Sequence, residues 1–278
     1  MRAAYSLFMT LGCLAAMVAE FYQDFRERPA LDPALRVFGP GAEEVVSYEA
    51  EGLRIRLARN RDPSGAVGVQ PRFAICGDFE ITASYQILDA DPGPFGPGAN
   101  LRVIVGQPMR EAADLARYRR IDEGDIYFVN RATAVPGGQP RRDSMTFPAR
   151  TNAGRLRLRR TGSTLQFLVA EGPNAPFGQL AQKEFVTDDC ILRFVAHTGK
   201  GPGVDVRLVD LRIRADRLSP APGPGPRRAS RARPVVIIAA CVVAGLMVVV
   251  GLFWWGRRKK TAATQVARRA PSGRRPTR

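Results

Sequence analysis

The chain has 278 residues, enough for one or two domains, and its 45% hydrophobic and 24% charged residues are typical of a folded protein. The formal net charge of +16 would ordinarily suggest a nucleic-acid partner. However, residues 20–219 hold all 26 acidic residues and a net charge of only +2, so the basic excess lies at the chain ends. A nucleic-acid-binding domain would carry that excess on a folded face, and we therefore expect no nucleic-acid partner.

Residues 1–19 have the layout of a secretory signal peptide, with one Arg, a short apolar stretch and then small residues. Cleavage is expected after Ala19, although Met17 is an unusual residue at the third position before the cut. The alternative is a buried or uncleaved N-terminal segment. The signal-peptide interpretation predicts that the domain that follows, residues 20–218, is exported.

Within this domain, short runs alternate between apolar and polar residues, the period of two that β-strands with one buried face require. The apolar phase changes near Leu208–Val209, which predicts a β-bulge. Only residues 110–120 look helical. Ten strands are expected, at 53–57, 67–70, 78–87, 101–105, 126–130, 154–160, 165–170, 179–185, 191–197 and 204–216. This pattern predicts an all-β fold, a two-sheet antiparallel sandwich.

The C-terminal part reads as a membrane anchor. Residues 219–234 form a Pro/Gly/Arg linker, and residues 235–255 contain no charge over 21 positions. Such a stretch is long enough for one transmembrane helix across about 30 Å of hydrocarbon. The alternative, a buried core helix, would need apolar neighbours on every side. Because the basic tail, residues 256–278, should remain cytoplasmic, we expect a single-pass cell-membrane protein with an extracytoplasmic body.

The body is also similar to a known family. The resemblance rests on FYQDFR (21–26), EGLRIRL (51–57), CGDFEITASYQIL (76–88), GRLRLRRTGSTLQFLVAEG (154–172) and DVRLVDLRIRA (205–215). Together they are very similar to an uncharacterised domain family abundant in planctomycete bacteria, which itself resembles laminin-G and concanavalin A-like jelly rolls. The resemblance implies a jelly-roll sandwich over residues 20–217 of an exported or surface protein. It implies no activity and no functional residue.

Folds of this kind include glycosidases, which need two carboxyls about 5 to 10 Å apart. The candidate pair is Asp78 and Glu80, and the alternative is a solvated strand face. The laminarinase-like pattern Glu-x-Asp-x-x-Glu is absent. His197 is the only histidine, which leaves no His-rich metal site, and a turn or exposed position is expected for it rather than catalysis. We therefore expect no enzyme activity.

The loop 91–100 is the most distinctive candidate for binding, with Phe95 expected at its tip. Asp89, Asp91 and Asn100 could offer oxygen ligands to Ca²⁺, the one cofactor considered; otherwise the loop is a plain turn.

A row of arginines, Arg155, Arg157 and Arg159, could bind acidic glycans or could be an ordinary wet strand face. Cys76 and Cys190 could form one disulfide in an exported domain, or they could be two small buried core residues.

These observations predict a membrane-anchored module that binds a carbohydrate or an envelope protein without catalysis. The alternatives are a glycoside-processing enzyme and a structural envelope scaffold.

Overall fold

The computed structural model describes residues 18–27, 30–61, 65–198 and 201–220. The regular secondary structure of these residues is almost entirely antiparallel strand. In chain order the elements are β1 (Ala19–Asp24), β2 (Leu35–Phe38), a short helix α1 (Ala42–Val45), β3 (Val46–Glu49), β4 (Gly52–Leu57), β5 (Val67–Pro71), β6 (Phe73–Ala90), β7 (Gly98–Val105), β8 (Glu111–Arg120), β9 (Gly124–Thr133), β10 (Arg141–Pro148), β11 (Ala153–Thr161), β12 (Thr164–Ala170), β13 (Gly178–Glu184), β14 (Cys190–His197) and β15 (Val204–Pro220).

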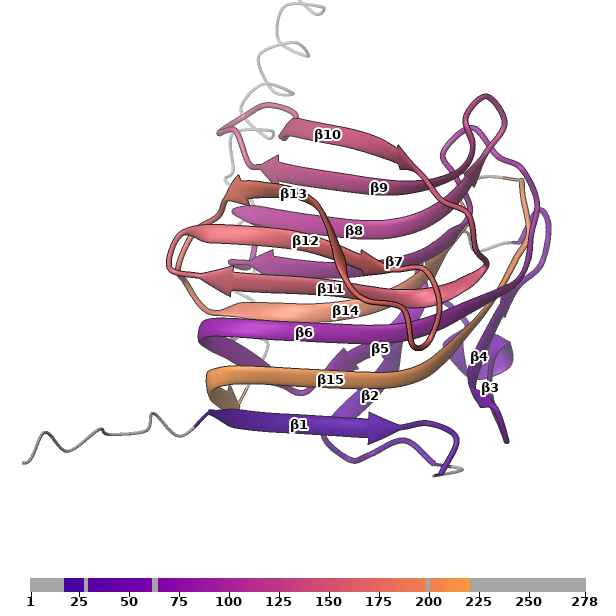
Figure 1. The fold of residues 1–278 in the computed structure, drawn as a ribbon, viewed down its shortest axis with the longest axis horizontal. Coiled ribbons are helices and arrows are strands. Elements are labelled where there is room, and N and C mark those ends of the chain that lie inside the picture. Colours follow the sequence, from indigo (N-terminus) through magenta and orange to yellow (C-terminus); the bar gives the residue numbers. More distant parts are fainter. Residues whose placement is uncertain (1–17, 28–29, 62–64, 199–200, 221–278) are drawn as a thin grey trace, which may run out of the picture. The chain divides into compact units, whose positions relative to one another are not determined.

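The strands form two layers. One layer, the β7 sheet, has the order β10-β9-β8-β7-β14-β5-β2. The other, the β6 sheet, has the order β13-β12-β11-β6-β15, and β15 pairs on its far side with both β1 and β4, while β3 extends β4. The layers join only where Cys190 of β14 pairs with Ile75 of β6. Figure 1 shows strands of both layers running in nearly the same direction, as in aligned sandwiches.

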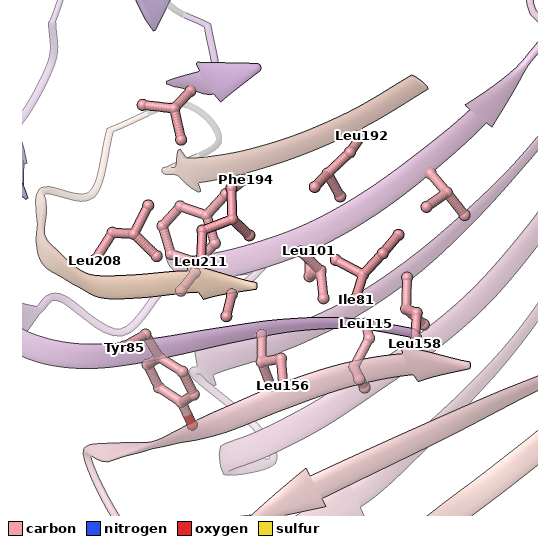
Figure 2. Close-up of a cluster of buried hydrophobic side chains, with 14 of the residues drawn as sticks. Ile81, Tyr85, Leu101, Leu115, Leu156, Leu158, Leu192, Phe194, Leu208 and Leu211 are labelled. Atoms are coloured by element: carbon pink, nitrogen blue, oxygen red, sulfur yellow. The ribbon is translucent and has the colours of Figure 1, made fainter. Parts of the chain in front are cut away.

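A hydrophobic core fills the space between the sheets (Figure 2). Both sheets contribute fully buried side chains to it. The β7 sheet supplies Leu101, Leu115, Leu192 and Phe194, and the β6 sheet supplies Ile81, Tyr85, Leu156, Leu158, Leu208 and Leu211. Each fully buried aliphatic or aromatic side chain contributes roughly 1.5–3 kcal/mol, so this core accounts for much of the stability. The predicted all-β antiparallel sandwich is confirmed.

Each of the ten ranges expected from the alternation overlaps an observed strand. The predicted bulge is also confirmed, because the register between β15 and β6 shifts between Leu208 and Asp210. The shift lets Leu208 and Leu211 both point into the core although an odd number of positions separates them.

The helix expected at residues 110–120 is wrong: this segment is strand β8. Its Ala, Leu, Glu and Arg residues favour helix, and eight of its ten residues are buried, so no apolar/polar alternation marks it as a strand. Pairing with β7 on one side and β9 on the other overrides that local preference. Strand β8 supplies the central residue of the candidate site described below.

The predicted membrane anchor, residues 235–255, the linker after residue 220, the tail 256–278 and residues 1–17 of the predicted signal peptide lie outside the described residues. Within the described ranges, no helix is long and apolar enough to cross a membrane. The anchor and the signal peptide therefore remain predictions.

The disulfide considered for Cys76 and Cys190 is not formed, since both thiols are free and buried. The Sγ of Cys76 lies 3.2 Å from the hydroxyl oxygen of Ser219. Burial raises the pKa of Cys190 to about 12, which makes this thiol unreactive near neutral pH. The second interpretation, two small buried residues, describes both.

Candidate functional site

A straight row of polar residues crosses the outer face of the β7 sheet, the face turned away from the core. Each of the seven strands contributes one member, at positions that lie opposite one another across the sheet. From β2 to β10 the members are Arg36, Gln70, Arg193, Arg102, Asp114, Asn130 and Ser144. We call this set the polar row. Because Gln70, Asp114 and Asn130 are buried although they face away from the core, this face of the sheet is recessed.

Asp114 of β8 occupies the centre of the recess and is only 5% exposed. The side-chain amide of Asn100 donates a hydrogen bond to its Oδ1 at 2.9 Å, and that of Asn130 donates to its Oδ2 at 2.9 Å. The Nε of Arg102 lies 3.4 Å from Oδ1. The hydroxyl of Ser144 in turn contacts the Oδ1 of Asn130 at 3.0 Å. These contacts hold the carboxylate in one orientation, as a preorganised binding group requires.

Asp114 lies in a cleft of about 550 Å³, which we call the Asp114 cleft. That volume is within the range of small-molecule sites, roughly 300–1,000 Å³. The described lining residues are Gly65, Phe95, Asn100, Arg102, Asp114, Tyr118, Arg120, Phe128, Asn130, Arg142 and His197. Three of these are aromatic: the rings of Tyr118 and Phe128 lie 5.8 Å apart, and Phe95 is 66% exposed. The cleft therefore combines polar groups at its base with aromatic surface, and one ring is freely accessible.

Four buried polar atoms of residues that line this cleft have no hydrogen-bond partner among the described residues: Nδ1 of His197, Oδ1 of Asn100, and the Nε atoms of Arg102 and Arg120. Native proteins rarely leave such atoms unsatisfied, so each is available to a ligand or a water molecule. Burial lowers the pKa of His197, the nearby Arg102 lowers it further, and Asp114 opposes the shift. The imidazole is therefore neutral at pH 7 and can either donate or accept.

Acidification should destabilise the protein through His197. Because its folded-state pKa lies below the usual value of 6.5, the unfolded chain binds the proton first, and stability falls as pH drops through 6.5. We expect the free energy of unfolding to decrease between pH 7.5 and 5.5 by about 1 kcal/mol more in the native protein than in His197→Gln. Urea titrations at the two pH values measure this difference. Equal decreases in both proteins would contradict the prediction, since no other histidine is present.

The sequence singled out Phe95 and Asn100 as binding residues, and the structure brings both to the Asp114 cleft. It also shows residues that the sequence did not indicate, above all Asp114 and Tyr118, because both lie on the segment expected to be helical. One sequence signal could have pointed to Asp114. It is spaced by even numbers of residues from Ala112, Ala116 and Tyr118, and a strand places residues at such spacings on one face.

The other binding candidates, Arg155, Arg157 and Arg159, lie on β11 in the β6 sheet and do not line the Asp114 cleft. The guanidinium groups of Arg155 and Arg157 pack over the ring of Phe177, at 4.5 and 3.8 Å from its centroid. These two arginines line a separate cleft of about 600 Å³. Arg159 pairs with Glu80 at 2.8 Å.

Asp78 and Glu80, the two carboxyls considered for glycosidase chemistry, already form hydrogen bonds and ion pairs within the sheet. Oδ1 of Asp78 accepts a hydrogen bond from the backbone N–H of Gly162 at 2.7 Å. Glu80 lies between Arg157, at 3.3 Å, and Arg159. Neither carboxyl lines a described cleft, so the structure places this pair on a strand face engaged in local pairing.

The three oxygen ligands considered for Ca²⁺ do not converge. Asp91 accepts hydrogen bonds from Arg59 at 2.6 Å and from the backbone N–H of Gly203 at 2.7 Å, whereas the amide of Asn100 binds Asp114. In the part of the chain that the structure describes, no group of three or more His, Cys, Asp or Glu side chains could hold a metal ion.

Comparison with known families places most of the chain in one of them. The profile of a family described as "Protein of unknown function (DUF1583) C domain" matches residues 13–232. No curated protein matches the sequence.

Solved structures share the fold at low sequence identity. A GH43 protein from Bacillus licheniformis, BlXynB, superposes with a TM-score of 0.53 at 10% identity over 70% of this chain and 39% of that chain. A structure described with endo-acting O-glycanases of the human gut microbiota gives 0.52 at 15% identity over 69% and 97%. A Crh5 transglycosylase in complex with NAG gives 0.50 at 12% identity over 71% and 84%. At these identities the likeness establishes the fold, a concanavalin A-like jelly roll, and nothing finer.

Proposed function

We propose that this chain, which belongs to the DUF1583 C-domain family, is an exported module that binds a carbohydrate in the Asp114 cleft. The observation that carries the proposal is the fixed carboxylate at the base of a cleft that also holds an exposed aromatic ring. Saccharides present hydroxyl groups beside apolar ring faces, and this combination of groups is suited to both.

Each part of the cleft has a role in such binding. Asp114 accepts hydrogen bonds from sugar hydroxyls, and the unpartnered Oδ1 of Asn100 offers a second acceptor beside it. The neutral His197 donates or accepts as the hydroxyl requires. Phe95 covers the apolar face of a sugar ring. Three proteins of similar fold are described as a GH43 protein, in connection with O-glycanases, and as a transglycosylase in complex with NAG, and these descriptions support this substrate class.

A binding role is favoured over glycoside hydrolysis. Hydrolysis by the usual mechanisms needs two carboxyl groups that flank the scissile bond. Among the described residues that line the Asp114 cleft, Asp114 is the only carboxylate, and Asn100, Asn130 and Arg102 already engage it. The proposed role is therefore recognition without chemistry.

Export and anchoring complete the proposal, and they rest on the sequence of residues 1–19 and 235–255. With a C-terminally tagged chain, protease added to intact cells should digest residues 20–218 and spare the tag. N-terminal sequencing should find a mature protein that starts at Glu20, within β1. A protected domain that retains Met1 would overturn this part of the proposal.

The binding proposal predicts a specific effect of Phe95→Ala. We expect the full-length protein to bind oligosaccharides on a glycan array, and the variant to bind the same ligand about tenfold more weakly, because aromatic stacking contributes roughly 0.5–1.5 kcal/mol beyond area burial. Since Phe95 is exposed, the melting temperature of the variant protein should equal that of the native protein. Tyr22→Ala, an exposed aromatic residue on β1 of the other sheet, is the matched control. Absence of any saccharide ligand, or a loss confined to Tyr22→Ala, would refute the proposal.

A further inference from the structure

Two arginines lie directly opposite each other in the polar row. Arg193 of β14 pairs in register with Arg102 of β7, and their side chains share the outer face of the β7 sheet. Arg36 lies at the same level two strands away, opposite Gln70. Like charges directly opposite each other on a sheet are destabilising, and proteins usually place an acidic side chain between them.

That acidic side chain is not found on the Arg193 side. Arg102 contacts Asp114 through Nε, yet this buried nitrogen makes no hydrogen bond. Arg193 donates from Nε to the Oε1 of Gln70 at 3.1 Å, and its guanidinium lies 4.9 Å from the centroid of the Phe38 ring. Neither partner carries a charge. Among the residues that the structure describes, no carboxylate pairs with Arg193.

The positive charges of Arg102 and Arg193 also repel each other. Burial lowers the pKa of Arg193, and the neighbouring Arg102 and Arg36 lower it further. A bound anion would reverse these effects, because it would restore the neutralisation that the sheet itself does not supply. Guanidinium groups bind carboxylate and sulfate through paired N–H donors, so two half-buried arginines side by side form a suitable receptor.

We propose that the ligand of this module is an acidic saccharide whose carboxylate or sulfate group binds between Arg102 and Arg193. This inference rests on the proposed function and names the substrate class of that site: Arg102 lines the Asp114 cleft, and Arg193 lies beside the cleft, opposite Arg102 in the polar row. The polar row sets the order of the contacts: the anionic group lies on the β14 side, and neutral hydroxyls lie on the β8 side. Asp114 repels an anion, so the acidic group cannot bind at the base of the cleft as well.

Matched pairs of oligosaccharides test the proposal with the full-length protein. The first pair is oligogalacturonate and its methyl ester, and the second is a sulfated galactan oligosaccharide and its desulfated form. We expect at least tenfold tighter binding of the acidic member of one pair, and the pair that shows it identifies the group as carboxylate or sulfate. Raising the salt concentration should reduce this preference, because exposed ionic contacts are screened.

Arg193→Gln should reduce the preference for the acidic member over the neutral member at least tenfold. Its affinity for the neutral member should stay within about twofold of that of the native protein. Arg56→Gln, on the exposed outer face of β4, should leave both affinities unchanged. Inorganic sulfate should compete with the acidic member more strongly than chloride at equal ionic strength, a measurement that needs no variant.

These experiments distinguish failure of the anion site from failure of the proposed function. Equal affinity for the two members of both pairs would overturn the anion site and leave carbohydrate binding intact. Binding of no saccharide would overturn the proposed function itself. A preference that survives Arg193→Gln in a folded variant would also overturn the anion site.

Discussion

Asp114→Asn is expected to weaken saccharide binding by at least 100-fold, about 3 kcal/mol, and to lower the free energy of unfolding by about 2–3 kcal/mol. The carboxylate accepts hydrogen bonds from the amides of Asn100 and Asn130 on its two oxygens. In the variant, one of these amides must face an NH₂ group, so a buried donor loses its acceptor. Arg102 simultaneously loses its only acidic neighbour among the described residues.

Isothermal titration calorimetry and urea denaturation measure the two effects separately. Asp143→Asn is a matched control, because Asp143 lies on β10, is 62% exposed and pairs with Lys183 at 2.6 Å. Because the Asp143 carboxylate is open to solvent, although the Lys183 side chain is only 8% exposed, losing this pair should cost less than losing Asp114, and the control should bind saccharide normally. Binding by Asp114→Asn within threefold of the native protein would show that the ligand lies elsewhere.

Arg160→Leu is expected to lower the free energy of unfolding by about 3–5 kcal/mol. Arg160 is 1% exposed, although it carries a charge. Its Nε donates to the carbonyl oxygen of Gly77 at 3.0 Å, and its Nη1 donates to those of Val186 at 3.0 Å and Asp188 at 2.8 Å. The guanidinium also packs over the ring of Phe79. Leucine retains the apolar contact but leaves three carbonyl groups without this donor.

The neighbouring residue provides the control for this prediction. Arg159 is 44% exposed and pairs with Glu80, so Arg159→Leu should cost less than about 1 kcal/mol. Urea unfolding of both variants gives the comparison. Equal decreases in the free energy of unfolding of the two variants would mean that the buried hydrogen bonds of Arg160 contribute little to stability. Because the Val186–Asp188 segment leads into β14, a folded Arg160→Leu protein should also show faster amide exchange at the start of that strand.

The fold follows closely from local sequence patterns. Alternation at 53–57, 154–160 and 204–216 predicted strands because one face of each packs against the core and the other meets water. The phase change at Leu208–Val209 predicted the bulge for the same reason. Where both faces are buried, as in β8, this signal is absent and helix-favouring residues give the wrong answer.

The candidate site was only partly accessible from sequence. Phe95 and Asn100 stood out because the Pro/Gly-rich loop before β7 is distinctive, and both line the Asp114 cleft. Asp114 did not stand out, since its partners Asn100 and Asn130 belong to other strands. The arginine row on β11 did stand out, yet it lies on the other sheet, where Phe177 and Glu80 occupy it.

The sequence by itself determined ten of the fifteen strands that the structure describes, the two-sheet class and the location of the charge excess, because these depend on the residues within each segment. Only the tertiary structure decided the polar row. Its members are drawn from positions as distant as Arg36 and Arg193, and they meet because pairing between seven strands aligns one residue of each at the same level. That register is set by long-range packing of the opposite faces against the core, which no single segment encodes.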